Sequence, residues 1–321
     1  MPAPLHIAIL DCDIPVPNVY AARNYYSDIF ASLLRDAASK SAEFEGLELK
    51  FSRYDSMKGE EPSDEELRGL DGIIITGSAS SAYDKVPWIE ALTALCHKIY
   101  TQHPHIRIFG SCFGHQLLSH VLFSPPGQNI VCKDPNGWEL GVHPITLSPQ
   151  FQAHFGPVTS NPERPNELRL QFVHADHVDL HELPEGFVSV GRSSHCGLQG
   201  VWKRGRVLTY QGHAEFDRFV NCETLRVFGK VIWEEEFIKR ALEQVDQDDD
   251  AVWAAGVMLR FFLEDGEGLE RTKEMVLERT EASTGSFLRF QMEKMARLLQ
   301  YVQEMWSSWF STGWKSKEHI E

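Results

Sequence analysis

The sequence has no long apolar run and little positive charge, and each absence excludes a class of protein. No apolar stretch approaches the roughly 20 residues that a membrane-spanning helix needs, so we predict no membrane insertion. Lys and Arg total 31 against 46 Asp and Glu among 321 residues, which gives a net charge of −15. Because nucleic-acid binding depends on clustered Lys and Arg, we also predict no nucleic-acid partner.

Patterns for metals, nucleotides and secretion are also missing. The six cysteines are far apart with no CxxC pair, and no His/Cys/carboxylate set has the spacing of a metal site. There is no GxxxxGK[ST] phosphate loop, which argues against an ATP-driven ligase, and we expect neither metal nor cofactor. The N-terminal segment MPAPLHIAILDCDIP is typical of a core strand rather than a signal peptide. We therefore expect free thiols and a cytosolic or nuclear protein.

The sequence does contain enough apolar residues for a substantial core, at 42% against 24% charged residues. Short β-rich runs alternate with helical stretches through its first two-thirds. The predicted strands are Leu5–Leu10, Leu47–Tyr54, Asp71–Thr76 and Ile106–Phe109, and the predicted helices are Tyr20–Ala38 and Val86–Tyr100. This alternation predicts βαβ units around a parallel sheet that is covered on both faces.

From about residue 130 the pattern changes to short strand-like runs between Pro, Gly and Asn. These runs are Gly141–Leu147, Leu168–Val173, Phe187–Val190, Gly197–Trp202 and Arg206–Tyr210. We predict that they add antiparallel or mixed strands to the same sheet. Helical patterns follow over Asp217–Gln244 and Ala251–Leu263.

The last part of the chain carries an amphipathic stripe. Its apolar residues recur at spacings of three to five: Phe287, Phe290, Met295, Leu298, Val302, Met305 and Trp309. We predict a domain over 1–265 and a helical extension over 266–321 that packs back onto the domain. A docking surface for a partner or for a second copy is the alternative.

The strongest local motif is FGSCFGHQLL, in which Cys112 stands between a strand and a helix. Glycines two positions before and after the cysteine, Gly110 and Gly114, permit a sharp turn that exposes a nucleophile at the sheet edge. The amides at the start of the helix favour a thiolate. A buried cysteine in a glycine turn is the alternative interpretation.

A second segment, YQGHAEF, supplies groups that such a nucleophile needs in amide chemistry. His213 and Glu215 are two positions apart after a strand, so both can project from one turn. His213 would accept the thiol proton and return it to the leaving amine, and Glu215 would orient the imidazole. A surface turn is the alternative for an isolated HxE pair.

A third segment, ITGSASSAYD, follows the apolar strand Asp71–Thr76. An acyl-transfer site needs backbone donors for a developing oxyanion. The amides of Gly77 and Phe113 are candidates, although a simple turn or a phosphate loop has a similar pattern.

Together these three segments resemble class I glutamine amidotransferase domains, and most closely free-standing members similar to the glutaminase half of GMP synthase. The resemblance covers about residues 4–263. It extends to four further segments: NGWELGV from Asn136, FVHADHV from Phe172, LPEGF from Leu183 and SSHCGLQG from Ser193. It implies a flavodoxin-like α/β fold, with a mostly parallel sheet, helices on both faces and the C-terminal helical tail as an addition.

The resemblance also implies residue roles. Cys112 is the expected nucleophile, His213 the base and Glu215 its partner, with the oxyanion hole at Gly77 and Phe113. The expected contacts to the amino-acid end of the substrate are Gln116, His174, Asp176, Ser194 and His195. Two departures from the family pattern, Ser111 for an aliphatic residue and Ala214 for proline, remove no catalytic group.

The expected reaction is thiol hydrolysis of the glutamine side-chain amide through a γ-glutamyl thioester. No acceptor domain is recognisable in the chain, so ammonia would pass to an acceptor on a separate protein in a biosynthetic pathway. Three alternatives stay open: a γ-glutamyl peptidase acting on glutathione-type conjugates, a peptidase-like relative with a similar cysteine elbow, and a non-catalytic scaffold.

Overall fold

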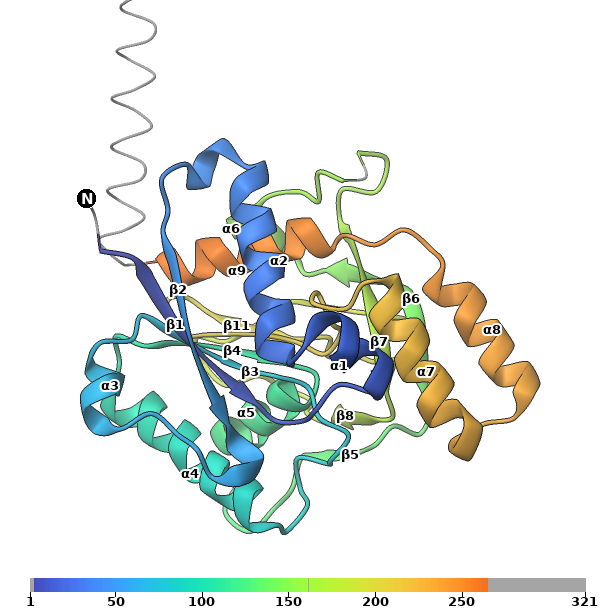
Figure 1. Ribbon diagram of the computed structural model, residues 1–321, viewed down its shortest axis with the longest axis horizontal. Helices are drawn as coiled ribbons and strands as arrows, with labels where there is room; N and C mark the ends of the chain where they lie inside the picture. The colour runs from blue at the N-terminus through green and yellow to red at the C-terminus, as the bar shows by residue number, and fades with distance from the viewer. Residues whose placement is uncertain (1–2, 161, 265–321) are drawn as a thin grey trace, which may run out of the picture. The chain divides into compact units, whose positions relative to one another are not determined.

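The computed structural model describes residues 3–160 and 162–264, which lie in one compact unit. A seven-stranded sheet with the order β2-β1-β3-β4-β12-β11-β9 forms its centre (Figure 1). Its strands are β1 (Leu5–Asp11), β2 (Leu49–Asp55), β3 (Gly72–Ile75), β4 (Arg107–Ser111), β9 (Val188–Ser189), β11 (Val201–Lys203) and β12 (Val207–Tyr210). The first five in sheet order are parallel, and β11 and β9 join antiparallel. The predicted mostly parallel α/β fold is confirmed.

Helices cover both faces of this sheet, which explains why its central strands are continuous apolar runs. On one face, α2 (Tyr26–Lys40) and α9 (Ala251–Leu263) pack in a core cluster that includes Ile74 and Phe109. On the other face, α4 (Pro87–Gln102) and α5 (Phe113–Phe123) pack with neighbouring strand residues that include Ile73 and Ile75. The short helix α3 (Asp64–Arg68) contributes to this second cluster through Leu67.

The prediction that all later strands join the main sheet is only partly right. The strands β6 (Glu139–Leu147), β7 (Glu167–His174) and β10 (Gly191–Arg192) form a sheet of their own, and β5 (Val131–Lys133) pairs with β8 (Asp176–Val178). The cause is a change of partner at Val190: the strand before it pairs with β11 of the main sheet, and the strand after it pairs with β6.

Each of two predicted long helices is in fact two helices. The first is α1 (Pro17–Arg23) followed by α2, and the helical conformation is interrupted at Asn24, where φ is +61°. The second is α7 (Arg218–Ile232) followed by α8 (Glu235–Val245), with Trp233 in an extended conformation between them. The strands predicted over the first two-thirds, α4 and α9 agree with the sequence patterns to within a few residues.

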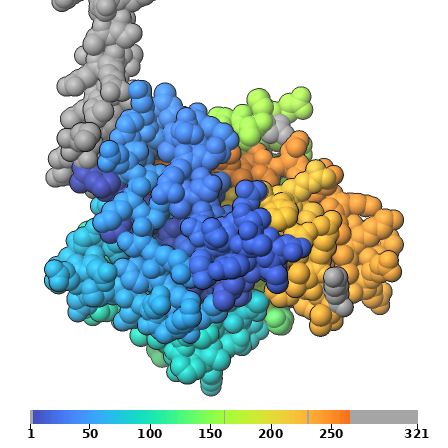
Figure 2. Space-filling view, in the orientation of Figure 1, coloured from blue at the N-terminus to red at the C-terminus, as the bar shows by residue number. Residues whose placement is uncertain are grey.

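The remaining elements are α6 (Pro149–Phe155) and the short 3₁₀ helices η1 (Ala42–Phe44) and η2 (Ser56–Lys58). On the face shown in Figure 2, the surface of α1 in dark blue adjoins that of α7 in gold, and Val19 and Val220 belong to one apolar cluster. Within residues 3–160 and 162–264, no helix has the length and apolar character to cross a membrane. The predicted extension over 266–321 lies outside the described residues.

Candidate active site

Three neighbouring parallel strands end beside one another and carry the three predicted segments. Ile75 of β3 pairs with Gly110 of β4, and Ser111 of β4 pairs with Tyr210 of β12. Gly77, Cys112 and His213 therefore follow at the same edge of the sheet, where the carboxyl ends of parallel strands meet. Ligands of open α/β sheets bind at this edge.

Cys112 lies at a strained elbow between β4 and α5. Its φ of 49° and ψ of −101° are unusual for a residue with a side chain, and such backbone strain is common at functional sites. The flanking glycines are required for close packing rather than for positive φ. A Cβ on Gly110 would stand 2.5 Å from the backbone of Gly114, and one on Gly114 would stand 2.4 Å from the carbonyl oxygen of Ile75.

His213 and Glu215 lie beside this elbow, as predicted. Nδ1 of His213 lies 2.8 Å from Oε1 of Glu215, and both side chains are buried. The amide of His213 donates to the carbonyl oxygen of Gln171 at 2.8 Å, which ties the segment to β7. Nε2 of His213 has no hydrogen-bond partner among the described residues, so this nitrogen is available for a proton from Cys112.

The charges around His213 favour its protonated form. Burial alone would lower the pKa of the imidazole, but the negative charge of Glu215, together with that of an ionised Cys112, raises this pKa from the usual 6.5 to about 10. The geometry is therefore suited to a thiolate–imidazolium pair. Phe216 stacks on the imidazole, with ring centroids 3.9 Å apart, and limits its rotation.

Gly77 and Phe113 lie close to the same group. A Cβ on Gly77 would stand 2.9 Å from Cε1 of His213 and 3.8 Å from Cβ of Cys112, so the backbone of Gly77 directly borders both side chains. Phe113 is the first residue of α5, and the amide of a first helical residue has no acceptor within its own helix. Both residues are thus adjacent to Cys112, as an oxyanion hole requires.

Two further contacts were not predicted from the sequence. The Ser111 hydroxyl donates to the carboxylate of Glu215, at 2.9 Å from Oε1 and 3.2 Å from Oε2. Nε2 of Gln211 donates to Sγ of Cys112 at 3.5 Å. The replacement at Ser111, noted as a departure from the family pattern, was the one available signal. Partners 104 and 99 positions apart cannot be matched from one sequence.

A cavity of about 340 Å³ opens onto Cys112 and His213. Its lining includes polar side chains, at Ser81, Gln116, Lys133 and Asp176, and apolar side chains, at Trp138, Phe228 and Ile232. A cysteine and a histidine therefore lie together at a cavity, which is where candidate active sites are found.

Comparisons with known proteins agree with this arrangement. A family model described as glutamine amidotransferase class-I matches residues 25–225, which is more than half of the chain. The chain belongs to this family. A Schizosaccharomyces pombe protein named as glutamine amidotransferase-like is 30% identical over 261 residues, which cover 81% of this chain and 99% of that protein.

The chain is also similar in sequence to a plant peptidase and in structure to a bacterial amidotransferase. Gamma-glutamyl peptidase 3 of Arabidopsis thaliana is 28% identical over 201 residues, covering 61% of this chain and 76% of the peptidase. The crystal structure of a glutamine amidotransferase from Thermotoga maritima has a TM-score of 0.58 at 18% identity and covers 80% of this chain and 98% of that one. The structural likeness supports the class I amidotransferase fold.

Three of the five predicted substrate contacts line the cavity of this amidotransferase-like domain: Gln116, His174 and Asp176. Much of their polar capacity is used within the protein. The Gln116 amide donates to the Asp176 carbonyl oxygen at 2.9 Å, and His174 contacts that oxygen through Nδ1 and Glu139 through Nε2, both at 2.9 Å. These three residues therefore help to build the cavity wall, and fewer of their polar atoms are free to contact a substrate.

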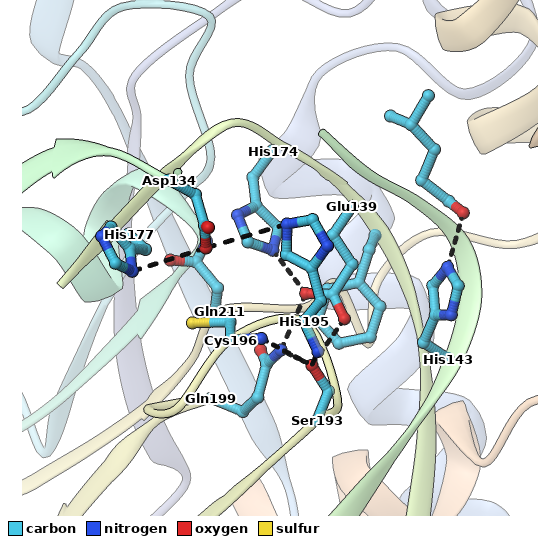
Figure 3. A network of polar contacts seen from close by, with 12 residues as sticks. Asp134, Glu139, His143, His174, His177, Ser193, His195, Cys196, Gln199 and Gln211 are labelled. Atoms are coloured by element: carbon cyan, nitrogen blue, oxygen red, sulfur yellow. Dashed lines mark hydrogen bonds and ion pairs between the residues drawn. The ribbon is translucent and has the colours of Figure 1, made fainter. Parts of the chain in front are cut away.

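The other two predicted contacts, Ser194 and His195, do not line the cavity. Ser194 is exposed, and His195 lies beside His174, with ring centroids 6.2 Å apart (Figure 3). The neighbouring Ser193 is the residue that joins the buried network, since its hydroxyl donates to Glu139 at 2.7 Å. Lys133 and Trp138 line the cavity but were not singled out from the sequence.

The structure brings together three potential metal ligands that no sequence motif indicated. Asp134, His177 and Cys196 are far apart in the chain, yet their potential ligand atoms all lie within 4.8 Å of one another. None of the three lines the cavity. Sequence spacing missed this group because it assembles from separate segments.

Proposed function

We propose that this protein hydrolyses γ-glutamyl amides by thiol catalysis, with Cys112 as nucleophile, His213 as acid and base, and Glu215 as the residue that orients His213. The observation that carries the proposal is that Cys112, His213 and Gly77 line one cavity, with Glu215 bound to the far side of the His213 ring.

In the first half-reaction the thiolate of Cys112 attacks the side-chain carbonyl carbon and forms a C–S bond. The oxyanion that develops receives the amides of Gly77 and Phe113. The imidazolium of His213 gives its proton to the leaving nitrogen, and the C–N bond breaks to leave a γ-glutamyl thioester and ammonia or an amine. The raised pKa of His213 supports its role as the proton donor in this step.

In the second half-reaction water attacks the thioester carbonyl. His213, now neutral, takes a proton from the water, the C–S bond breaks, and Cys112 leaves as a thiolate while glutamate is released. The ion pair between Lys133 and Asp176, at 2.7 Å, lines the cavity. A pair of opposite charges suits the α-carboxylate and α-amino groups of a glutamyl substrate.

With glutamine as substrate, the released ammonia would pass to an acceptor on a separate protein in a biosynthetic pathway. The other candidate function is a γ-glutamyl peptidase acting on glutathione-type conjugates. It is favoured by the apolar side chains of the cavity lining, at Trp138, Phe228 and Ile232, which suit an amide with a bulky apolar group, and by the similarity to gamma-glutamyl peptidase 3.

The test is to measure glutamate release by the full-length protein from glutamine and from a panel of γ-glutamyl peptides. We expect turnover that falls by about 10³-fold or more in Cys112→Ser. Cys132→Ser is the matched control, because Cys132 is an exposed thiol and is absent from the cavity wall.

The outcomes separate the candidates. Higher kcat/KM for glutamine supports the amidotransferase function, and higher kcat/KM for a peptide supports the peptidase. No turnover of any substrate, or turnover that Cys112→Ser leaves unchanged, would contradict the proposal and favour a non-catalytic scaffold.

A further inference from the structure

Three segments converge next to Lys133 and Asp176, two residues of the cavity lining. Asp134 follows β5, His177 lies in β8, and His195 and Cys196 precede β11. Figure 3 shows His177 and His195 directed toward the carboxylate of Asp134 from two sides.

The carboxylate of Asp134 is the unexplained group in this cluster. Its side chain is 1% exposed, and Oδ2 has no hydrogen-bond partner among the described residues. Nδ1 of His177 lies 3.4 Å away and Nε2 of His195 lies 3.7 Å away. A buried carboxylate oxygen without a hydrogen bond is costly, so its position calls for an additional partner.

These separations match those between the ligands of a metal ion. Four ligands arranged tetrahedrally at about 2.0–2.3 Å from Zn²⁺ lie roughly 3.3–3.8 Å from one another. The thiol of Cys196 completes the set, since the ligand atoms of Asp134, His177 and Cys196 are all within 4.8 Å of one another.

We propose that Asp134, His177 and Cys196 bind one Zn²⁺ ion and leave its fourth position to water, since Nε2 of His195 lies 3.2 Å from the carbonyl oxygen of Gly137. The combination of imidazole and sulfur ligands favours zinc over Mg²⁺ or Ca²⁺, which prefer oxygen. The carboxylate and the Cys196 thiolate together balance the charge of the ion. Burial keeps the Cys196 thiol protonated in the absence of metal, since it raises the pKa to about 12, and zinc would displace that proton.

A metal ion at this position would cross-link segments that carry cavity-lining residues. The amide of Asp134 donates to the carbonyl oxygen of Ala175 at 2.7 Å, next to Asp176 of the cavity lining. His177 follows Asp176 directly. The ion would therefore join β5, β8 and the 193–196 loop, and would stabilise the native protein without entering the reaction.

The test measures metal binding in full-length Cys112→Ser, because that substitution prevents zinc from binding to the proposed nucleophile. The protein is stripped of metal by chelation, loaded with Zn²⁺ and freed of unbound ions by gel filtration. We then expect one Zn²⁺ per chain by elemental analysis and a higher Tm than that of the stripped protein. When Co²⁺ is loaded instead, we expect a thiolate-to-metal absorption band. Asp134→Asn, His177→Gln and Cys196→Ser, each made in this background, should lower Zn²⁺ affinity at least about tenfold.

Cys222→Ser and His181→Gln are the matched controls, since Cys222 lies on α7 and His181 is exposed, and both should retain binding. Less than stoichiometric Zn²⁺, or undiminished binding by the three ligand variants, would overturn the proposal. If a ligand variant fails to fold, the Co²⁺ spectrum still decides, because the absence of a thiolate band excludes Cys196 as a ligand.

Discussion

Gly77 occupies a position where any side chain would collide with the ring of His213. A Cβ would stand 2.9 Å from Cε1 of this ring, and the ring cannot readily move because Glu215 and Phe216 hold it. We expect Gly77→Ala to reduce kcat for glutamate release at least about tenfold, since small displacements of catalytic groups are costly. Steady-state kinetics measure this change.

Gly197→Ala is the control for the Gly77 substitution. No atom lies within 4 Å of the position that its Cβ would take, so an added methyl group has space. We expect unchanged kcat and KM. Equal activity of the two variants would contradict the placement of Gly77 beside the imidazole.

The charge of Glu215 makes the stability of the protein depend on pH. Because the pKa of His213 is raised from 6.5 to about 10 in the native state, protonation of the ring stabilises the fold fully below pH 6.5. This contribution is lost as the pH rises through 10, with a slope of about 1.4 kcal/mol per pH unit between these values.

Glu215→Gln removes the charge that raises this pKa, so the difference in unfolding free energy between wild type and variant should shrink from pH 7 to pH 10. Urea unfolding at several pH values measures it, and a difference that stays constant would contradict the assignment.

The sequence predicted the residues that form the site more fully than the contacts that orient them. Cys112, His213 and Glu215 could be identified because each sits in a short motif after an apolar strand. The donors from Ser111 and Gln211 could not, since pairing them with their acceptors requires the register of β4 against β12. Ser194 was chosen from its motif, but it is exposed and the neighbouring Ser193 makes the buried contact.

At the scale of elements, the strands and helices that form the two-sided core were predictable from their apolar runs, and the helix breaks were not. Nothing in the periodicity marks the positive φ of Asn24 or the extended conformation of Trp233. Both breaks lie between helices whose apolar patterns continue almost unchanged across them. The position of each break follows from tertiary packing, which local patterns do not report.

Helix α9 is held on the sheet by an aromatic ring that fills the space over a glycine. A Cβ on Gly72 of β3 would stand 2.5 Å from the ring of Phe262, and this ring is 1% exposed. We expect Phe262→Ala to lower the free energy of unfolding by about 3–5 kcal/mol, measured by urea denaturation. Since α9 lies away from the cavity lining, kcat of the folded variant should be unchanged.

The control for this helix is Val252→Ala, because Val252 lies on α9 but is 40% exposed. Its effect should stay within about 0.5 kcal/mol. A loss comparable to that of Phe262→Ala would show that the stability of α9 depends on the helix itself rather than on the buried ring.

At the scale of the whole molecule, the cavity is assembled from segments that span most of the described chain. Ile14 follows β1, Ser81 follows β3, Trp138 precedes β6 and Phe228 lies on α7. The sequence predicted the edge of the sheet where the site lies, because strand ends carry the motifs. It predicted His174 and Asp176 of the opposite wall but not how that wall is built, because β6 and β7 were assigned to the main sheet and β5 and β8 were not predicted.

This assembly predicts that the apolar side chains of the cavity lining select among substrates. Trp138 is one of them and packs edge-on against Trp233, with ring centroids 4.9 Å apart. We expect Trp138→Ala to raise KM about tenfold for γ-glutamyl peptides with a bulky apolar residue, since this change removes apolar contact. The KM for glutamine, which has no such group, should stay within about twofold.

Val231→Ala is the control, because Val231 is 86% exposed on α7. Equal increases in KM for both substrates would contradict selection by the apolar lining and assign Trp138 a general role in holding the site together.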